Sequence, residues 1–285
     1  LIEPGYRLGG MSSGGLGQTD IGNKQVVKGL SLDFYRRVGS YYNSLENWVF
    51  EPKVAEQVFK EYIERGKIDV LYGHRILSLN KNCETIEKIR LESQDGFMGR
   101  AEVKAKIYID CSYEGDLMAR SGVEYVVGRE PNSQYGETWN GVHMLDGHQF
   151  PDGVDPYVVE GDASSGLLWG ISDEKLQKEG SGDDKVQAYN YRICLTSDKH
   201  NQIPISRPKD YDSTKYELLL RLMKAKPSEK LADYFIISPM PNNKTDINNR
   251  GGFSSDMIGM NHNYPEASYS EREDIIQAHK SYTLG

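Results

Sequence analysis

The chain has 285 residues, enough for one large domain or two ordinary ones, and its 38% hydrophobic and 27% charged residues are typical of a globular protein. Its 34 Lys and Arg against 42 Asp and Glu give a net charge of −8, and no basic cluster offers a footprint for phosphates, so a nucleic-acid partner is not expected. No run of about 18 apolar residues predicts a membrane span.

The first twenty residues, LIEPGYRLGGMSSGGLGQTD, read as the end of a strand followed by a loop with six glycines. A buried strand is a short apolar run that stops at turn residues, and Leu1-Ile2 before Glu3-Pro4-Gly5 is only the end of one. We therefore expect the domain to begin before residue 1, which leaves a signal peptide and the cellular compartment open.

Residues 51–66 carry apolar side chains at helical spacing, with Pro52 near the start and Gly66 as the stop, and predict a helix. Strands are expected at 68–72 and 75–79. The segments IEKIRLES and AEVKAKIYID, separated by an Asp95-Gly96 turn signal, predict a β-meander followed by a strand, KIYIDCS, that ends at Tyr113.

The segment LMARSGVEY predicts a short helix closed by Gly122 and then another strand. From Arg129 the composition shifts to Asn, Asp, Gly, Tyr and Pro. An apolar run at 164–171, a strand at 188–196 and a helix at 213–226 are expected there. A final helix starts where Ser270 stands three residues before Glu273, the spacing of a capping box.

The end of the first strand has the chemistry of a nucleotide site. An acidic residue that closes the second strand of a Rossmann-type unit accepts hydrogen bonds from the ribose hydroxyls, and Glu3 stands in that place. Gly9-Gly10 and Gly14-Gly15 would let the backbone pass close to a pyrophosphate or a flavin ring, since no Cβ blocks the approach. The alternative is an ordinary Glu-Pro-Gly turn.

The segment Ile109 to Leu117 repeats this pattern, because it ends a predicted strand, starts a helix and carries small residues with an acid. The alternative is a capped helix start at which Asp116 only interacts with the helix dipole.

Five segments together resemble the bacterial FAD-dependent oxidoreductase family, whose members in polysaccharide-degrading bacteria are sometimes labelled xanthan lyases. They are LIEPGYRLGGMSSGGLGQTDIGN, WVFEPKVAEQVF, YIDCSYEGDLMARSGVEYVVGREPNSQYGETWNG, VQAYNYRICLT and MPNNKTDINNRGGFSSDMIGMNHNYPEA. The resemblance implies a glutathione-reductase-type flavoprotein with an α/β fold. The expected fold is an incomplete FAD/NAD(P)-binding Rossmann-like domain with a β-meander (1–128), joined to a mixed α+β, loop-rich, substrate-facing region that ends in a helix (129–285).

The resemblance assigns cofactor-binding roles residue by residue. Glu3 matches the acid that binds the ribose, and by analogy Arg75 lies on the strand that meets the adenine. The loop that passes the pyrophosphate and flavin corresponds to Gly9, Gly10, Met11, Ser12, Gly14 and Gly15, and the second nucleotide-facing strand end to Ser112, Glu114, Gly115 and Asp116.

The family's glycine-rich phosphate turn and its closing C-terminal segment have no counterpart in residues 1–285. We therefore expect FAD in the intact protein, no tightly bound FAD in this chain alone, and no activity of this chain by itself. A first strand lost from the sheet also leaves an edge that favours pairing with a neighbouring chain.

Two polar clusters could line the substrate side of the flavin. The first contains Arg129, Asn132, Tyr135, Glu137 and Asn140, and the second spans 242–256. The catalytic candidates are Arg129, Tyr135 and Glu137 of the first cluster, together with His143. The alternative is that these residues serve loop turns. His148 and His262 are further candidate proton carriers.

No metal site is expected. Cys83, Cys111 and Cys194 are an odd number at wide spacings, and Arg250 and Met257 occupy ligand positions of the only calcium-loop-like segment.

The expected function is a FAD-dependent oxidoreductase that transfers a hydride from a polar small molecule, such as one derived from a sugar, to the flavin. The alternatives are a polysaccharide lyase or hydrolase without net redox chemistry and a non-catalytic binding domain. A lyase needs no nucleotide site, so Glu3 and its glycine loop argue against it.

Overall fold

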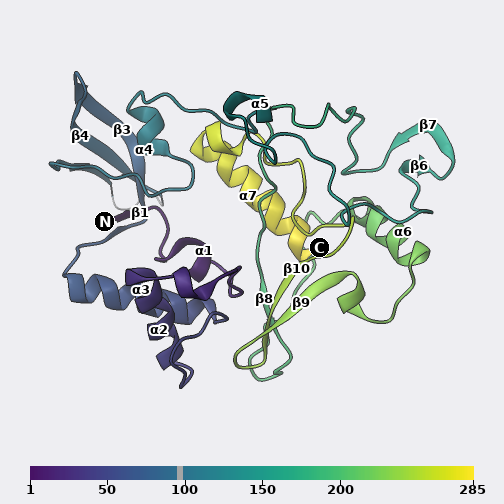
Figure 1. Cartoon of the computed structure of the whole chain (residues 1–285), viewed down its shortest axis with the longest axis horizontal. Coiled ribbons are helices and arrows are strands. Elements are labelled where there is room, and N and C mark those ends of the chain that lie inside the picture. Colours follow the sequence, from purple (N-terminus) through teal and green to yellow (C-terminus); the bar gives the residue numbers. More distant parts are fainter. Residues whose placement is uncertain (95–98) are drawn as a thin grey trace. The chain divides into compact units, whose positions relative to one another are not determined.

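A computed structural model describes residues 1–94 and 99–285 as a mixed α/β protein with several small sheets (Figure 1). The described chain divides into two compact units. Unit 1 contains residues 1–125 and 239–246, and unit 2 contains residues 126–238 and 247–285. The division into a FAD-binding domain (residues 1–128) and a substrate-facing region (residues 129–285) stays a prediction.

The helical half of unit 1 packs two amphipathic helices around aromatic residues. Its elements are α1 (Gly10–Ser13), the 3₁₀ turn η1 (Lys24–Val26), α2 (Gly29–Ser40) and α3 (Pro52–Gly66). One buried cluster contains Phe34 of α2, Val58 of α3 and Phe50, which lies just before α3. The rings of Phe34 and Phe50 meet edge to face at 5.7 Å. The helix predicted at 51–66 is confirmed, because its apolar positions fall on the face that α2 covers.

Gly39, near the end of α2, has no room for a side chain. An alanine Cβ there would lie 2.7 Å from the Ser44 carbonyl oxygen and 2.7 Å from the Glu46 Cα. Alanine normally stabilises a helix interior by about 0.5–1 kcal/mol relative to glycine, but this overlap is with backbone, which cannot turn aside. We expect Gly39→Ala to lower the free energy of unfolding by about 1–3 kcal/mol in urea denaturation.

Gly22→Ala is the matched control, since no atom of the described residues lies within 4 Å of its added Cβ. A stability of Gly39→Ala equal to or above that of Gly22→Ala would show that α2 and the 44–46 turn are not in this close contact.

The sheet half of unit 1 contains the predicted β-meander. Strands β3 (His74–Asn82), β4 (Thr85–Ser93) and β5 (Arg100–Val103) pair antiparallel in the order β3-β4-β5. Ile89 and Leu91 of β4 pack with Leu117 of α4 (Asp116–Arg120). A separate parallel pair joins β1 (Ile2–Glu3) to β2 (Leu71–Tyr72). The predicted Asp95-Gly96 turn lies outside the described residues.

Two predicted strands are wrong. Strand β5 ends at Val103, and residues 104–115 and 123–127 have no strand pairing. Ile107 and Ile109, which alternate as in a strand, are 76% and 77% exposed. An alternating pattern specifies which face a strand buries, but the strand forms only where a neighbouring backbone accepts its hydrogen bonds, and no described residue pairs there.

Unit 2 surrounds a core cluster that includes Leu218, Tyr234, Phe253 and Tyr282. Its helical elements are α5 (Asn132–Tyr135), η2 (Ser213–Tyr216), α6 (Glu217–Ala225), η3 (Leu231–Asp233), η4 (Tyr264–Glu266) and α7 (Tyr269–Leu284). Between α5 and η2 in the chain, β6 (Tyr157–Val159) and β7 (Asp162–Leu167) pair as an antiparallel hairpin. The predicted helices at 213–226 and at the C-terminal end are confirmed. The capping box of α7 is formed by Ser268 and Glu271 instead of the predicted pair two residues later.

A further three-stranded sheet has the order β8-β10-β9, from β8 (Cys194–Thr196), β9 (Phe235–Met240) and β10 (Lys244–Asn249). The strand predicted at 188–196 therefore keeps only its last three residues. The β9–β10 hairpin was not predicted, although its tip carries a hairpin signal. Asn242 and Asn243 both have positive φ, 59° and 57°, which two-residue hairpin turns require and which Asn tolerates.

Candidate functional site

The glycine loop of unit 1 is held in shape by its own chain. Gly9 and Gly10 have φ of 105° and 52°, and a Cβ on them would overlap the Phe59 ring and the Tyr113 hydroxyl respectively. Both glycines are therefore needed for backbone conformation and close packing. The side chain of Met11, the next residue, is 60% exposed.

The structure brings this loop against the 110–116 segment. The Met11 amide donates a hydrogen bond of 2.8 Å to the Tyr113 hydroxyl. Two of the sequence segments singled out for nucleotide binding thus meet in unit 1, although about a hundred residues separate them.

Asp110 organises the 110–116 segment. Its carboxylate accepts hydrogen bonds from the Ser112 amide (2.9 Å) and hydroxyl (2.7 Å) and from the Met118 amide (3.0 Å). Burial raises the pKa of Asp110, but these hydrogen bonds outweigh it and leave the pKa below its ordinary value. The carboxylate therefore stays charged and binds an amide in the first turn of α4. Gly115 precedes α4 with φ 68°, and Glu114 and Asp116 flank it.

Glu3 and Arg75, the candidate ribose and adenine residues, differ in whether their charged groups form an ion pair. Glu3, half-buried at the end of parallel strand β1, accepts a 2.7 Å hydrogen bond from the Gly5 amide with Oε1, and within the described residues no hydrogen bond reaches its Oε2. Arg75 donates to Glu92 on the neighbouring strand at 2.9 Å, so its guanidinium takes part in an ion pair of the meander.

In unit 2 the first polar cluster closes around residues 179–183. Arg129 and Asp183 exchange two backbone hydrogen bonds of 2.8 and 2.9 Å, and the guanidinium binds both oxygens of the Asp183 carboxylate, with Nε to Oδ1 at 2.9 Å. The hydrogen bond from Arg129 lowers the pKa of Asp183, and the same bond raises the pKa of Arg129. This bidentate ion pair and the two backbone hydrogen bonds fix Arg129, at the start of the cluster, against Asp183.

His143 is held on both ring nitrogens. Nδ1 lies 3.1 Å from the Glu179 carboxylate, and Nε2 lies 2.8 Å from the Asn140 carbonyl oxygen. Both partners are acceptors, so both contacts are hydrogen bonds only when the imidazole carries two protons. The two contacts therefore fix the orientation of the imidazole ring.

The other two catalytic candidates are not brought into this network. Tyr135 is 65% exposed on α5, and Glu137 is exposed, with its amide bonded to the Asn132 carbonyl oxygen at 3.0 Å. Glu179 and Asp183, the acids that bind His143 and Arg129, were missed by the sequence analysis, because nothing local in their own segment marks them.

The second polar cluster, 242–256, is divided. Asn242 and Lys244 belong to unit 1, where each donates a 2.6 Å hydrogen bond to the carboxylate of Glu51. Asp256 belongs to unit 2 and accepts a hydrogen bond from Asn190. In the same unit the Val186 amide donates to His262 Nδ1 at 3.3 Å.

Glu51 was also missed. It is only 1% exposed, and Tyr42 binds it twice, accepting from its amide at 2.9 Å and donating to its carboxylate at 3.2 Å. In the sequence Glu51 is only the first residue of the helix predicted at 51–66. Its partner Lys244 lies 193 residues away and leaves no local signal.

Among the described residues, no three His, Cys, Asp or Glu side chains form a group that could hold a metal ion. In the part of the chain that the structure describes, every helix is too short or too polar to cross a bilayer.

Comparison with known proteins finds no curated protein and no solved structure that matches the chain. The model of one protein family, described as FAD dependent oxidoreductase, matches residues 1–284, nearly the full length. The chain therefore belongs to the FAD-dependent oxidoreductase family.

Proposed function

We propose that this protein oxidises a polar, carbohydrate-derived small molecule by transferring a hydride to FAD. The family match over residues 1–284 is the observation that carries the proposal, and FAD is the cofactor it implies for the intact protein. When bound, FAD supplies the electron-accepting chemistry, while the protein binds, orients and exchanges protons. No finding favours the lyase or the non-catalytic alternative.

Unit 1 has residues that fit a portion of a FAD site. Glu3 ends a parallel strand, where open α/β sheets bind nucleotides, and its Oε2 makes no hydrogen bond within the described residues. A carboxylate oxygen so placed fits a ribose hydroxyl. The glycine loop, with exposed Met11 and with Ser12, and the Asp110 turn, with Ser112, surround the contact between Met11 and Tyr113. Under this proposal unit 1 is a Rossmann-like FAD-binding unit of the glutathione-reductase type.

Unit 2 has residues that fit the handling of a polar substrate. Arg129 is fixed by Asp183 and can orient a hydroxyl or carboxylate, and the doubly bound His143 can give or take the proton that accompanies hydride transfer. Tyr135 and Glu137, exposed nearby in sequence, are assigned to substrate contact.

The ribose assignment is tested by Glu3→Gln in the intact protein. Loss of a charge-assisted hydrogen bond is worth about 1.5–3 kcal/mol, so we expect the dissociation constant for FAD to rise roughly 10- to 100-fold in a flavin fluorescence titration. Glu87→Gln, an exposed position on β4, is the matched control and should leave it unchanged. Equal FAD affinity in Glu3→Gln and Glu87→Gln would rule out Glu3 as the ribose ligand.

The reaction class is tested by mixing the FAD-loaded intact protein anaerobically with a panel of sugars, sugar acids and polyols. We expect at least one of them to bleach the visible absorbance of the flavin, because hydride transfer removes its oxidised chromophore. A flavoprotein that is bleached by none of the polar compounds but by an apolar substrate would refute the carbohydrate assignment and leave the flavin chemistry standing.

A further inference from the structure

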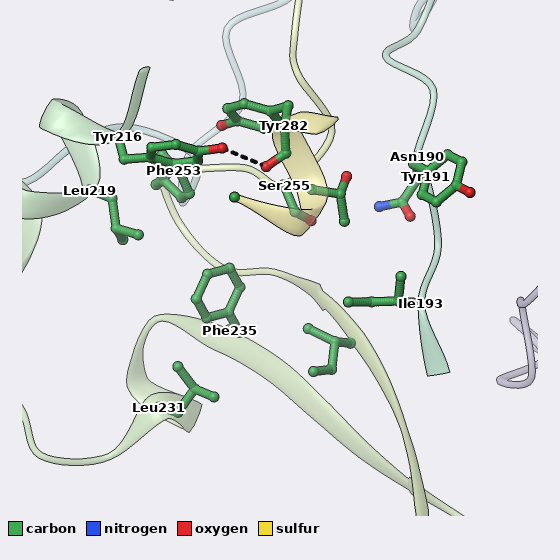
Figure 2. Close-up of a pocket in the computed structure, with 13 residues that line it drawn as sticks. Asn190, Tyr191, Ile193, Tyr216, Leu219, Leu231, Phe235, Phe253, Ser255 and Tyr282 are labelled. Atoms are coloured by element: carbon green, nitrogen blue, oxygen red, sulfur yellow. Dashed lines mark hydrogen bonds between the residues drawn. The ribbon is translucent and has the colours of Figure 1, made fainter. Parts of the chain in front are cut away.

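Unit 2 contains a cavity of about 220 Å³, lined in part by Phe253 and Tyr282 of its core cluster. The catalytic candidates Arg129 and His143 are not in its lining. Figure 2 shows Leu219, Leu231 and Phe235 on one side of it and Asn190, Tyr191 and Ile193 on the other. An apolar cavity of about 150 Å³ is enough to bind benzene in another protein, so this one has room for a substituted ring.

The wall of the cavity is mainly apolar and has no charged side chain. Its lining contains no Asp, Glu, Lys, Arg or His side chain. The rings of Phe235 and Phe253 meet edge to face, 6.5 Å apart, and present aromatic surface to the space between them and Ile193. Aromatic and branched aliphatic walls favour a flat apolar ligand, and the absence of a counter-charge disfavours an ionised one.

Two of the three tyrosines in the wall, Tyr216 and Tyr282, use their hydroxyl groups elsewhere. Tyr216 donates to the Tyr282 carbonyl oxygen at 2.8 Å, as drawn in Figure 2, and the Tyr282 hydroxyl donates to the Ser254 carbonyl oxygen at 2.8 Å. They therefore contribute ring surface. The polar groups left to meet a ligand include the hydroxyls of Ser255 and Thr283, and the Thr283 hydroxyl is buried without a hydrogen-bond partner among the described residues. The Asn190 amide also faces the cavity, and its Nδ2 binds Asp256.

We propose that this cavity is a binding site for a small neutral ring compound that carries a single hydroxyl or carbonyl group. The ring lies between Phe235, Ile193 and Leu219, and the polar substituent meets Ser255. The site lies wholly within unit 2 and does not depend on the flavin assignment.

The probe for the test is 4-fluorophenol, whose binding is followed by ligand-observed ¹⁹F NMR. For so small a ligand we expect a dissociation constant on the order of 1 mM. Fluorobenzene, which lacks the hydroxyl, should bind several-fold more weakly, and the anion 4-fluorobenzoate at least tenfold more weakly. Absence of 4-fluorophenol binding, or equal binding of 4-fluorobenzoate, would overturn the proposal.

Two independent variants fill the cavity, Leu219→Trp and Ile193→Phe. Each should weaken 4-fluorophenol binding at least tenfold, whereas Leu176→Trp, at an exposed position outside the lining, should not. A thermal melt identifies any variant that fails to fold, and the other then carries the test. Unchanged binding in a folded filling variant would place the ligand elsewhere.

Ser255→Ala tests the polar end of the site. We expect it to lower the affinity for 4-fluorophenol to that for fluorobenzene and to leave fluorobenzene binding unchanged. An unchanged preference for the phenol would contradict the assignment of Ser255.

Discussion

Replacing Lys244 by Met is expected to lower the free energy of unfolding of unit 1 by about 3–5 kcal/mol. Lys244 Nζ lies 2.6 Å from the Glu51 carboxylate, whose side chain is only 2% exposed. Removal of one partner leaves a buried charge without its main counter-charge, which costs far more than the intact pair contributes. Urea denaturation combined with hydrogen exchange of the α3 amides measures the loss within unit 1.

Lys60→Met is the matched control, because it breaks a second Lys–Glu pair of unit 1. Lys60 Nζ lies 2.7 Å from the Glu56 carboxylate on α3, and the lysine side chain is 44% exposed. Exposed pairs contribute about 0–1 kcal/mol, so this change should be small. A loss in Lys244→Met no greater than in Lys60→Met would show that the hairpin tip does not bury Glu51.

The same pair makes the stability of unit 1 depend on pH. Burial raises the pKa of Glu51, but hydrogen bonds from Lys244 and Asn242 and the charge of Lys244 outweigh it, so the pKa lies below its ordinary value of 4.5. The contribution is therefore fully present above about pH 4.5 and is lost as the pH falls through the lowered pKa of the folded state. Glu51→Gln should flatten this segment of the acid-unfolding curve, and an unaltered curve would assign the acid sensitivity to other groups.

Replacing His143 by Gln is expected to slow substrate-dependent flavin reduction by about 10²- to 10⁴-fold, the usual contribution of a general acid or base. Gln can keep a hydrogen bond to the Glu179 carboxylate or the Asn140 carbonyl oxygen, but its amide cannot accept and return a proton as an imidazole can. Stopped-flow absorbance of the flavin, with the sugar found in the bleaching screen, measures the rate.

His148→Gln is the control, since His148 is exposed five residues along the chain. Both variants should retain the flavin content of the parent protein, which separates a lost proton transfer from lost cofactor binding. If His143→Gln and His148→Gln reduce the flavin at the same rate, His143 is not the proton-transfer residue and exposed Tyr135 or Glu137 would take its place.

Local sequence patterns were sufficient to predict an element where its start signal, its stop signal and its apolar face all lie within one short segment. Helix α3 has Pro52 at its start, Gly66 at its end and Val54, Ala55 and Val58 on one face, and all three signals lie within fifteen residues. The paired strands β3 and β4 were likewise predicted, because antiparallel neighbours in sequence supply each other's hydrogen bonds. Membership of the FAD-dependent oxidoreductase family, which the family model shows over residues 1–284, was also indicated by local segments.

The contacts of the candidate site depend on residues far apart in the chain. The strand predicted through Ile107 and Ile109 does not form, because alternation of side chains cannot supply a partner backbone. Glu51 with Lys244, Arg129 with Asp183, and His143 with Glu179 join charges 193, 54 and 36 residues apart. A charge becomes buried, paired and chemically useful only when folding removes its water and brings its counter-charge within hydrogen-bond distance, and no local pattern records that event.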